Sequence, residues 1–220
     1  MRDRRAGAVA CSALVAFGVL LVLVAVGAAD GLDHPVARLV GRHPSSAGAD
    51  AARLVTDALS PGVDTAVLLV GAAVVSHRRR LLRPLAVAVA VVIAVTVVVL
   101  AVKHGLDRPL PHSGGRPDDG FPSGHTATTA CFLGALAVLM TAGHRRLLTR
   151  MLAAVAGLSL LVGASLVYAG YHWLTDVLAS LALGVATVAG LCLDRVGRSL
   201  IRPDDRPGAR VERHRRPSRP

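Results

Sequence analysis

The stretch GFPSGHTATTACFLGALAVLM, residues 120–140, joins a polar start to a long apolar run. The second half predicts an apolar helix, and Pro122, Ser123, Gly124 and His125 stand where that helix begins. Pro suits a first helical turn, Gly allows close backbone approach, and free N–H groups at a helix start attract anions. A plain helix cap would explain all but His125, because a cation is unfavourable there unless an anion is near. This stretch therefore predicts an apolar helix that opens onto an anion site.

The composition of the whole chain indicates an all-α, polytopic membrane protein. Of 220 residues, 53% are hydrophobic and only 3% aromatic, so Ala, Val and Leu form long runs. The net charge of +11 comes from Arg beside these runs, without interleaved aromatics, which argues against nucleic-acid binding. The three cysteines show no CxxC spacing and are interpreted as buried apolar residues: Cys11, Cys131 and Cys192.

Six stretches approach the roughly 20 apolar residues that a membrane-crossing helix needs. They are 7–29, 60–76, 84–103, 122–142, 151–170 and 177–194. The first is longer than the apolar part of a signal peptide, about 7–15 residues, so we expect a retained anchor. The predicted organisation is an N-terminal segment at 1–6, a six-helix membrane domain at 7–196 and a basic, disordered tail at 197–220.

Arginine placement predicts the orientation. Arg-rich segments alternate with Arg-poor ones, and the Arg-rich set is 1–5, 76–83, 144–150 and the tail from Arg195. The positive-inside rule places this set, with both termini, in the cytoplasm, and the PSGH segment and YHWLTD (171–176) outside. The Arg-rich, Lys-poor chain indicates a bacterial plasma membrane as the location.

Residues 49–60 predict a short amphipathic helix before the second span. Its apolar face is Ala51, Leu54, Val55, Ala58 and Leu59, and its polar face carries Asp50, Arg53, Thr56 and Asp57. Such a helix either lies in the membrane interface or packs on the bundle.

Three further residues suggest chemistry at the outer ends of the spans. Lys103 is the only lysine, which indicates either a site that needs a compact ammonium or a side chain that reaches the interface. His172 and Asp176 are four residues apart, so on a helical turn the carboxylate can orient the imidazole. A structural pair or a zinc site are the other interpretations of this spacing.

Together these segments resemble the type 2 phosphatidic acid phosphatase (PAP2) family, the membrane branch of the acid phosphatase and vanadium haloperoxidase superfamily. The family pattern reads K-x6-RP, PSGH and SR-x5-H-x3-D. Residues 122–125 match PSGH in full, and Ser165, His172 and Asp176 match the third motif at the correct spacing. Lys103 matches the lysine of the first motif, although Arg108-Pro109 stands two residues early. The resemblance covers roughly residues 60–195 and implies six membrane helices with a four-helix core that carries the site.

Two positions depart from the pattern. Leu110 and Leu166 stand where the family has arginines, and Arg108 and Arg116 are the nearby candidates to replace them.

The resemblance implies hydrolysis of a lipid phosphate or diphosphate, without metal or other cofactor, at the outer face of the membrane. His172 would attack phosphorus, Asp176 would orient it, and His125 would serve as acid and then base. The residues expected to hold the phosphoryl oxygens are Lys103, Arg108, Ser123, Gly124 and Arg116. Polyprenyl diphosphate, phosphatidate and phosphatidylglycerophosphate all fit as substrates. The alternative is a weak family member that binds lipid phosphate without turnover, while the spans exclude a soluble haloperoxidase.

Overall fold

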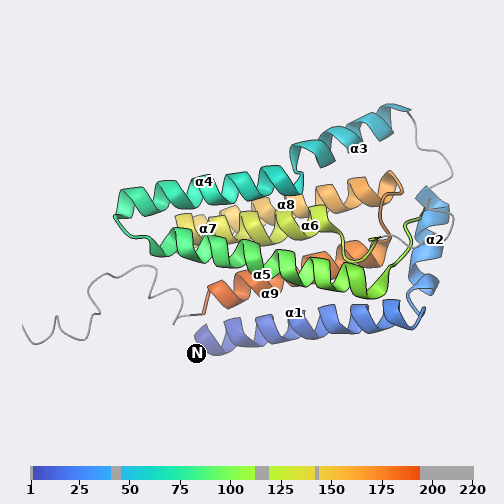
Figure 1. The fold of residues 1–220 in the computed structure, drawn as a ribbon, viewed down its shortest axis with the longest axis horizontal. Coiled ribbons are helices and arrows are strands. Elements are labelled where there is room, and N and C mark those ends of the chain that lie inside the picture. Colours follow the sequence, from blue (N-terminus) through green and yellow to red (C-terminus); the bar gives the residue numbers. More distant parts are fainter. Residues whose placement is uncertain (1, 41–45, 112–118, 142–143, 194–220) are drawn as a thin grey trace, which may run out of the picture.

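The computed structural model describes residues 2–40, 46–111, 119–141 and 144–193, and its regular structure is helical throughout these ranges (Figure 1). The predicted tail at 197–220 lies outside the described residues. The elements are α1 (Arg2–Ala25), α2 (Asp30–Val40), α3 (Ser46–Ala58), α4 (Pro61–Arg79), α5 (Arg83–Leu106), α6 (Gly124–Thr128), the π-helical turn η1 (Thr129–Leu133), α7 (Gly134–Met140), α8 (Arg145–Tyr168) and α9 (Leu174–Leu191).

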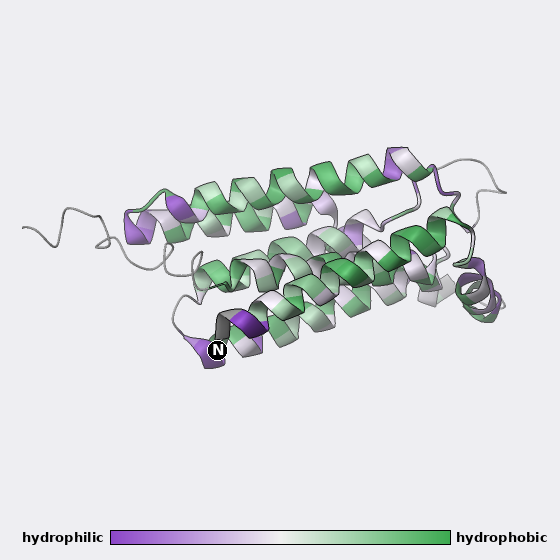
Figure 2. Cartoon of the chain, turned by 90° about the horizontal axis from the view of Figure 1, so that it is seen from below, coloured by the Kyte–Doolittle hydropathy of each residue, from purple (hydrophilic) through white to green (hydrophobic). Residues whose placement is uncertain are grey.

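The long helices run side by side and match the predicted spans within a few residues (Figure 1). Five apolar helical stretches are long enough to cross a membrane: Arg4–Ala25, Ala47–Arg79, Arg83–Leu106, Arg145–Tyr168 and Leu174–Leu191. The sixth predicted span, 122–142, corresponds to the shorter apolar helix Gly124–Met140. The hydropathy colours show apolar residues along the helices and polar residues toward their ends (Figure 2). With these helices, the chain is a multi-pass membrane protein.

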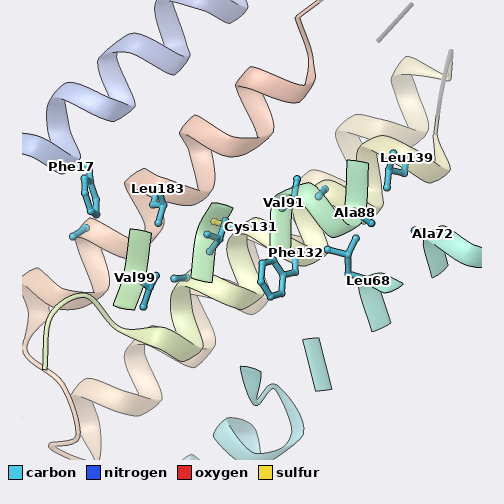
Figure 3. Packing of buried hydrophobic residues seen from close by; sticks show 14 of the residues in the cluster. Phe17, Leu68, Ala72, Ala88, Val91, Val99, Cys131, Phe132, Leu139 and Leu183 are labelled. Carbon is cyan, nitrogen blue, oxygen red and sulfur yellow. The ribbon is translucent and has the colours of Figure 1, made fainter. Parts of the chain in front are cut away.

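The short helix Gly124–Met140 is the most enclosed element. Its buried side chains include Phe132 and Leu139, which join a core formed with α4, α5 and α9 and with Phe17 of α1 (Figure 3). Close approach depends on small residues, since a Cβ placed on Gly184 of α9 would lie 2.4 Å from the Cβ of Ala130. Because neighbouring helices cover this segment, only the surrounding helices need a fully lipid-compatible surface.

One end of the bundle carries α2, α3 and the segments 107–111 and 169–173; we call it the α2–α3 end. The opposite end holds the N-terminus and the turn between α4 and α5 (Figure 1). The helix α2 was not predicted from the sequence, where Pro35 argues against a helix interior.

The predicted amphipathic helix at 49–60 is present as α3, which contacts α8. Its buried side chains are Ala52 and Thr56, whereas Leu54 of the predicted apolar face is 72% exposed. The apolar face thus points away from the protein, as expected for a helix whose outer face meets lipid.

Candidate active site

A cavity of about 410 Å³ opens at the α2–α3 end between segments that are distant in the sequence. Both histidines of the predicted site, His125 and His172, line it. The other lining residues are Arg53, Thr56, Asp57, Leu110, Leu166 and Tyr171. The structure therefore brings the PSGH segment and the H-x3-D segment to one hollow.

A tight turn after α8 positions His172. Gly170 has φ +71°, a left-handed conformation that favours glycine, and it reverses the chain. The amides of Tyr171 and His172 then donate to the carbonyl oxygen of Leu166, at 2.9 and 3.4 Å. These bonds hold the imidazole beside the first turn of α9.

Asp176 lies in that first turn and orients His172. Its Oδ2 accepts from the Trp173 amide at 2.9 Å and lies 3.2 Å from His172 Nδ1. An ionised carboxylate only accepts, so Nδ1 carries the proton and Nε2 keeps a lone pair. The geometry suits a histidine that acts through Nε2 as nucleophile or base.

The other oxygen of Asp176 joins a buried charge network. Arg108 Nη1 donates to Asp176 Oδ1 and, at 2.8 Å, to the Thr175 hydroxyl, while Arg108 Nη2 donates to Asp33 Oδ2 at 2.6 Å. Asp33 also accepts from the Thr175 amide at 2.9 Å and the Thr175 hydroxyl at 2.6 Å. The carboxylates of Asp33 and Asp176 are 1% and 0% exposed, so the charges satisfy one another away from water.

The surroundings of Arg108 differ from those expected of a phosphate ligand. Its side chain is 9% exposed, both terminal nitrogens bond to protein groups, and it does not line the histidine cavity. The Trp173 ring covers the guanidinium at 5.7 Å. These contacts favour a role in positioning Asp176 over direct contact with phosphate.

Ser123 and Gly124 lie at the start of α6. Ser123 is buried, and its hydroxyl caps the helix by accepting from the Thr126 amide at 3.4 Å. Nothing lies within 4 Å of a Cβ built on Gly124, so its backbone borders open space. Lys103 Nζ donates to the Asp119 carbonyl oxygen. Arg116 lies outside the described residues.

Leu110 and Leu166, which replace the two family arginines, both line the cavity. Two charged residues near the site were not singled out from the sequence. Asp33 comes from α2, and no motif marked it. Arg53 comes from α3, where its place on the polar face was the available signal.

Among the described residues, no group of three or more His, Cys, Asp or Glu side chains is arranged to hold a metal ion. The three cysteines are unpaired thiols, with Cys11 exposed and Cys131 buried, and none of them lines the cavity.

Comparisons with known proteins identify the family and the fold. The sequence model of the PAP2 superfamily matches residues 81–198, which include Lys103, the PSGH segment, His172 and Asp176. A search of curated proteins gave no match. Among solved structures, the fold is similar to that described as the first transmembrane PAP2-type phosphatidylglycerolphosphate phosphatase from Bacillus subtilis. The TM-score is 0.75 at 18% identity, over 89% of this chain and 98% of that one. This polytopic membrane protein belongs to the PAP2 superfamily.

Proposed function

We propose that this protein hydrolyses a lipid phosphate or diphosphate without a metal ion, through a phosphohistidine on His172. The observation that carries the proposal is the shared cavity, which has His172, oriented by Asp176, and His125 in its wall. Membership in a superfamily that includes the similar bacterial phosphatase supports the same reaction class.

In the first step, His172 Nε2 attacks phosphorus and the bond from phosphorus to the lipid oxygen breaks. His125 donates a proton to that leaving oxygen. In the second step, His125 takes a proton from water, the resulting hydroxide attacks phosphorus, and the P–N bond breaks to release phosphate and free His172. Asp176 holds the imidazole in the attacking tautomer and stabilises its positive charge when phosphorylated.

The phosphoryl oxygens need positive charge and N–H donors while charge shifts in the transition state. Lys103 and the Gly124 amide are the proposed donors near the first turn of α6, and Arg116 is a further candidate. Ser123 contributes by capping that turn, and Arg108 by holding Asp176.

Lipid is the proposed substrate class because the cavity opens at one end of a membrane bundle and has Leu110 and Leu166 in its wall. By the arginine distribution, this end faces outward at the plasma membrane. The same two leucines favour a second candidate function, binding of lipid phosphate with little turnover, since the cavity wall has no guanidinium at these positions.

The test is phosphate release by purified protein in detergent from a panel of polyprenyl diphosphate, phosphatidate and phosphatidylglycerophosphate. We expect release from at least one of them, its loss in His172→Ala with loss of any acid-labile phosphoenzyme, and strong slowing in Asp176→Asn. EDTA should leave the rate unchanged. Inactivation by EDTA that zinc reverses would contradict the metal-free mechanism, and lipid-phosphate binding without release would establish the second candidate.

A further inference from the structure

We propose that Arg53, on the amphipathic helix α3, is a substrate-binding residue: it supplies a guanidinium to this cavity and binds the phosphate of the lipid head group. The proposal rests on the proposed function, because it identifies a residue of that same site. It starts from the observation that α3 lies before the matched family region and yet lines the cavity.

The placement of α3 brings Arg53 to the histidines. The helix contacts α8, and Arg53 Nε donates to the hydroxyl of Tyr171 at 3.3 Å. Tyr171 directly precedes His172 in the sequence. Among the described residues, this is the only hydrogen bond of the Arg53 guanidinium. Its two terminal nitrogens remain as a pair of donors at an exposed position on the cavity wall.

The charges around the cavity leave this role to Arg53. Of the described residues that line it, Arg53 alone is permanently cationic, and the walls at Leu110 and Leu166 are apolar. The guanidinium of Arg108 is buried against Asp33 and Asp176. A phosphate that enters between His125 and His172 therefore meets Arg53 as its guanidinium partner.

The guanidinium of Arg53 and its place on α3 both suit contact with the phosphate of a lipid head group. A guanidinium can offer two parallel N–H donors to two phosphate oxygens, which makes such contacts strong and directional. Leu54, the next residue in the sequence, is 72% exposed on the outward apolar face of α3, where lipid is expected. Arg53 thus lines the cavity of His125 and His172 and is next in sequence to a residue of the lipid-facing surface, a position that suits contact with a lipid head group.

Asp57 carries the opposite charge to Arg53 and therefore provides a control for the proposed effect on phosphate binding. It lies one turn after Arg53 on α3 and lines the same cavity. Its carboxylate repels a phosphate, so neutralising Asp57 should strengthen binding, whereas neutralising Arg53 should weaken it. A purely structural role of α3 predicts no such opposition.

The experiment compares Arg53→Gln, Arg53→Lys and Asp57→Asn with Arg38→Gln, which removes an exposed arginine of α2 that does not line the cavity. Inorganic phosphate binding is measured by calorimetry, and kcat and KM with the best lipid phosphate. Arg53→Gln should weaken phosphate binding and raise KM about tenfold or more, as expected for one charged contact. Arg53→Lys should recover part of this loss, Asp57→Asn should tighten binding, and Arg38→Gln should match the unmodified protein.

Unchanged phosphate binding in Arg53→Gln would overturn the inference. So would equal weakening in Arg53→Gln and Asp57→Asn with a common fall in melting temperature, because α3 would then act by packing alone. Failure of the proposed function looks different: the unmodified protein would release no phosphate from any lipid, while the calorimetric comparison would still test Arg53.

Discussion

At the scale of single residues, Arg108 is buried against two carboxylates and does not line the cavity, so in the proposed reaction it would act without touching the substrate. Two carboxylates, Asp33 and Asp176, share its guanidinium, so the trio carries one net negative charge beside His172. In the proposed reaction, this negative charge would stabilise the positive charge of a phosphorylated His172 by direct attraction. Because Asp33 belongs to α2, this helix takes part in holding the proposed catalytic pair, His172 and Asp176.

Arg108→Ala should therefore lower kcat strongly while leaving phosphate affinity nearly unchanged. It should also reduce the free energy of unfolding by about 3–5 kcal/mol, the usual cost of leaving buried charges without a partner. Phosphate release, phosphate calorimetry and thermal unfolding in detergent measure the three effects. Arg108→Lys keeps the charge and should recover part of the stability. A tenfold loss of phosphate affinity with intact kcat would instead make Arg108 a direct phosphate ligand.

At the scale of helices, the site depends on close contacts between small residues. The helix α9 carries Asp176 at its start and meets the turn η1 at Gly184, whose neighbour is Ala130. The same helix meets Gly163 of α8 through Val177. These contacts bring α9, which carries Asp176, close to α8 and to the helical segment that contains His125, since larger side chains would separate the backbones.

We expect Gly184→Ala to destabilise the protein by about 1–3 kcal/mol, the usual cost of overpacking. The added methyl would lie 2.4 Å from the Ala130 Cβ, and 3.4 Å from its backbone, so the two elements must move apart. The matched control is Gly157→Ala on α8, where nothing lies within 4 Å and alanine favours the helix. Melting temperatures in detergent make the comparison; equal values for the two variants would contradict this account of the packing.

At the scale of the whole molecule, the two ends of the bundle differ in charge and in content. The α2–α3 end holds the cavity, whereas arginines such as Arg79, Arg83 and Arg145 gather at the opposite end. The positive-inside rule then predicts that the cavity opens on the outer side of the membrane.

Single cysteines in a background that lacks Cys11, Cys131 and Cys192 test this orientation in intact cells. Gly105→Cys lies at an exposed position near the α2–α3 end, and Leu82→Cys lies at the other end, where Leu82 is 80% exposed. A membrane-impermeant thiol reagent should label position 105 and spare position 82 until the cells are permeabilised. Labelling of position 82 alone would reverse the orientation and place the cavity in the cytoplasm.

The sequence alone was enough to predict the spans, the family and the pairing of His172 with Asp176. Lipid requires apolar helices whose backbone bonds are internal, so the runs of Ala, Val and Leu predict the long helices directly. An H-x3-D spacing is local, because residues four apart on a helix share a face whatever surrounds them. That His125 and His172 share one site was expected only because the order of the motifs resembles the family pattern. The other residues that line the cavity could not be predicted from the sequence.

The long-range contacts required the tertiary structure. Asp33 and Arg108 are 75 positions apart, and Arg53 and Tyr171 are 118 apart, so no local pattern connects them. The partners of a charged side chain depend on which helices pack together, and that packing depends on many weak contacts throughout the bundle. For this reason the sequence could not show that the fold buries Arg108 against two carboxylates and places Arg53 in the wall of the cavity that His125 and His172 line.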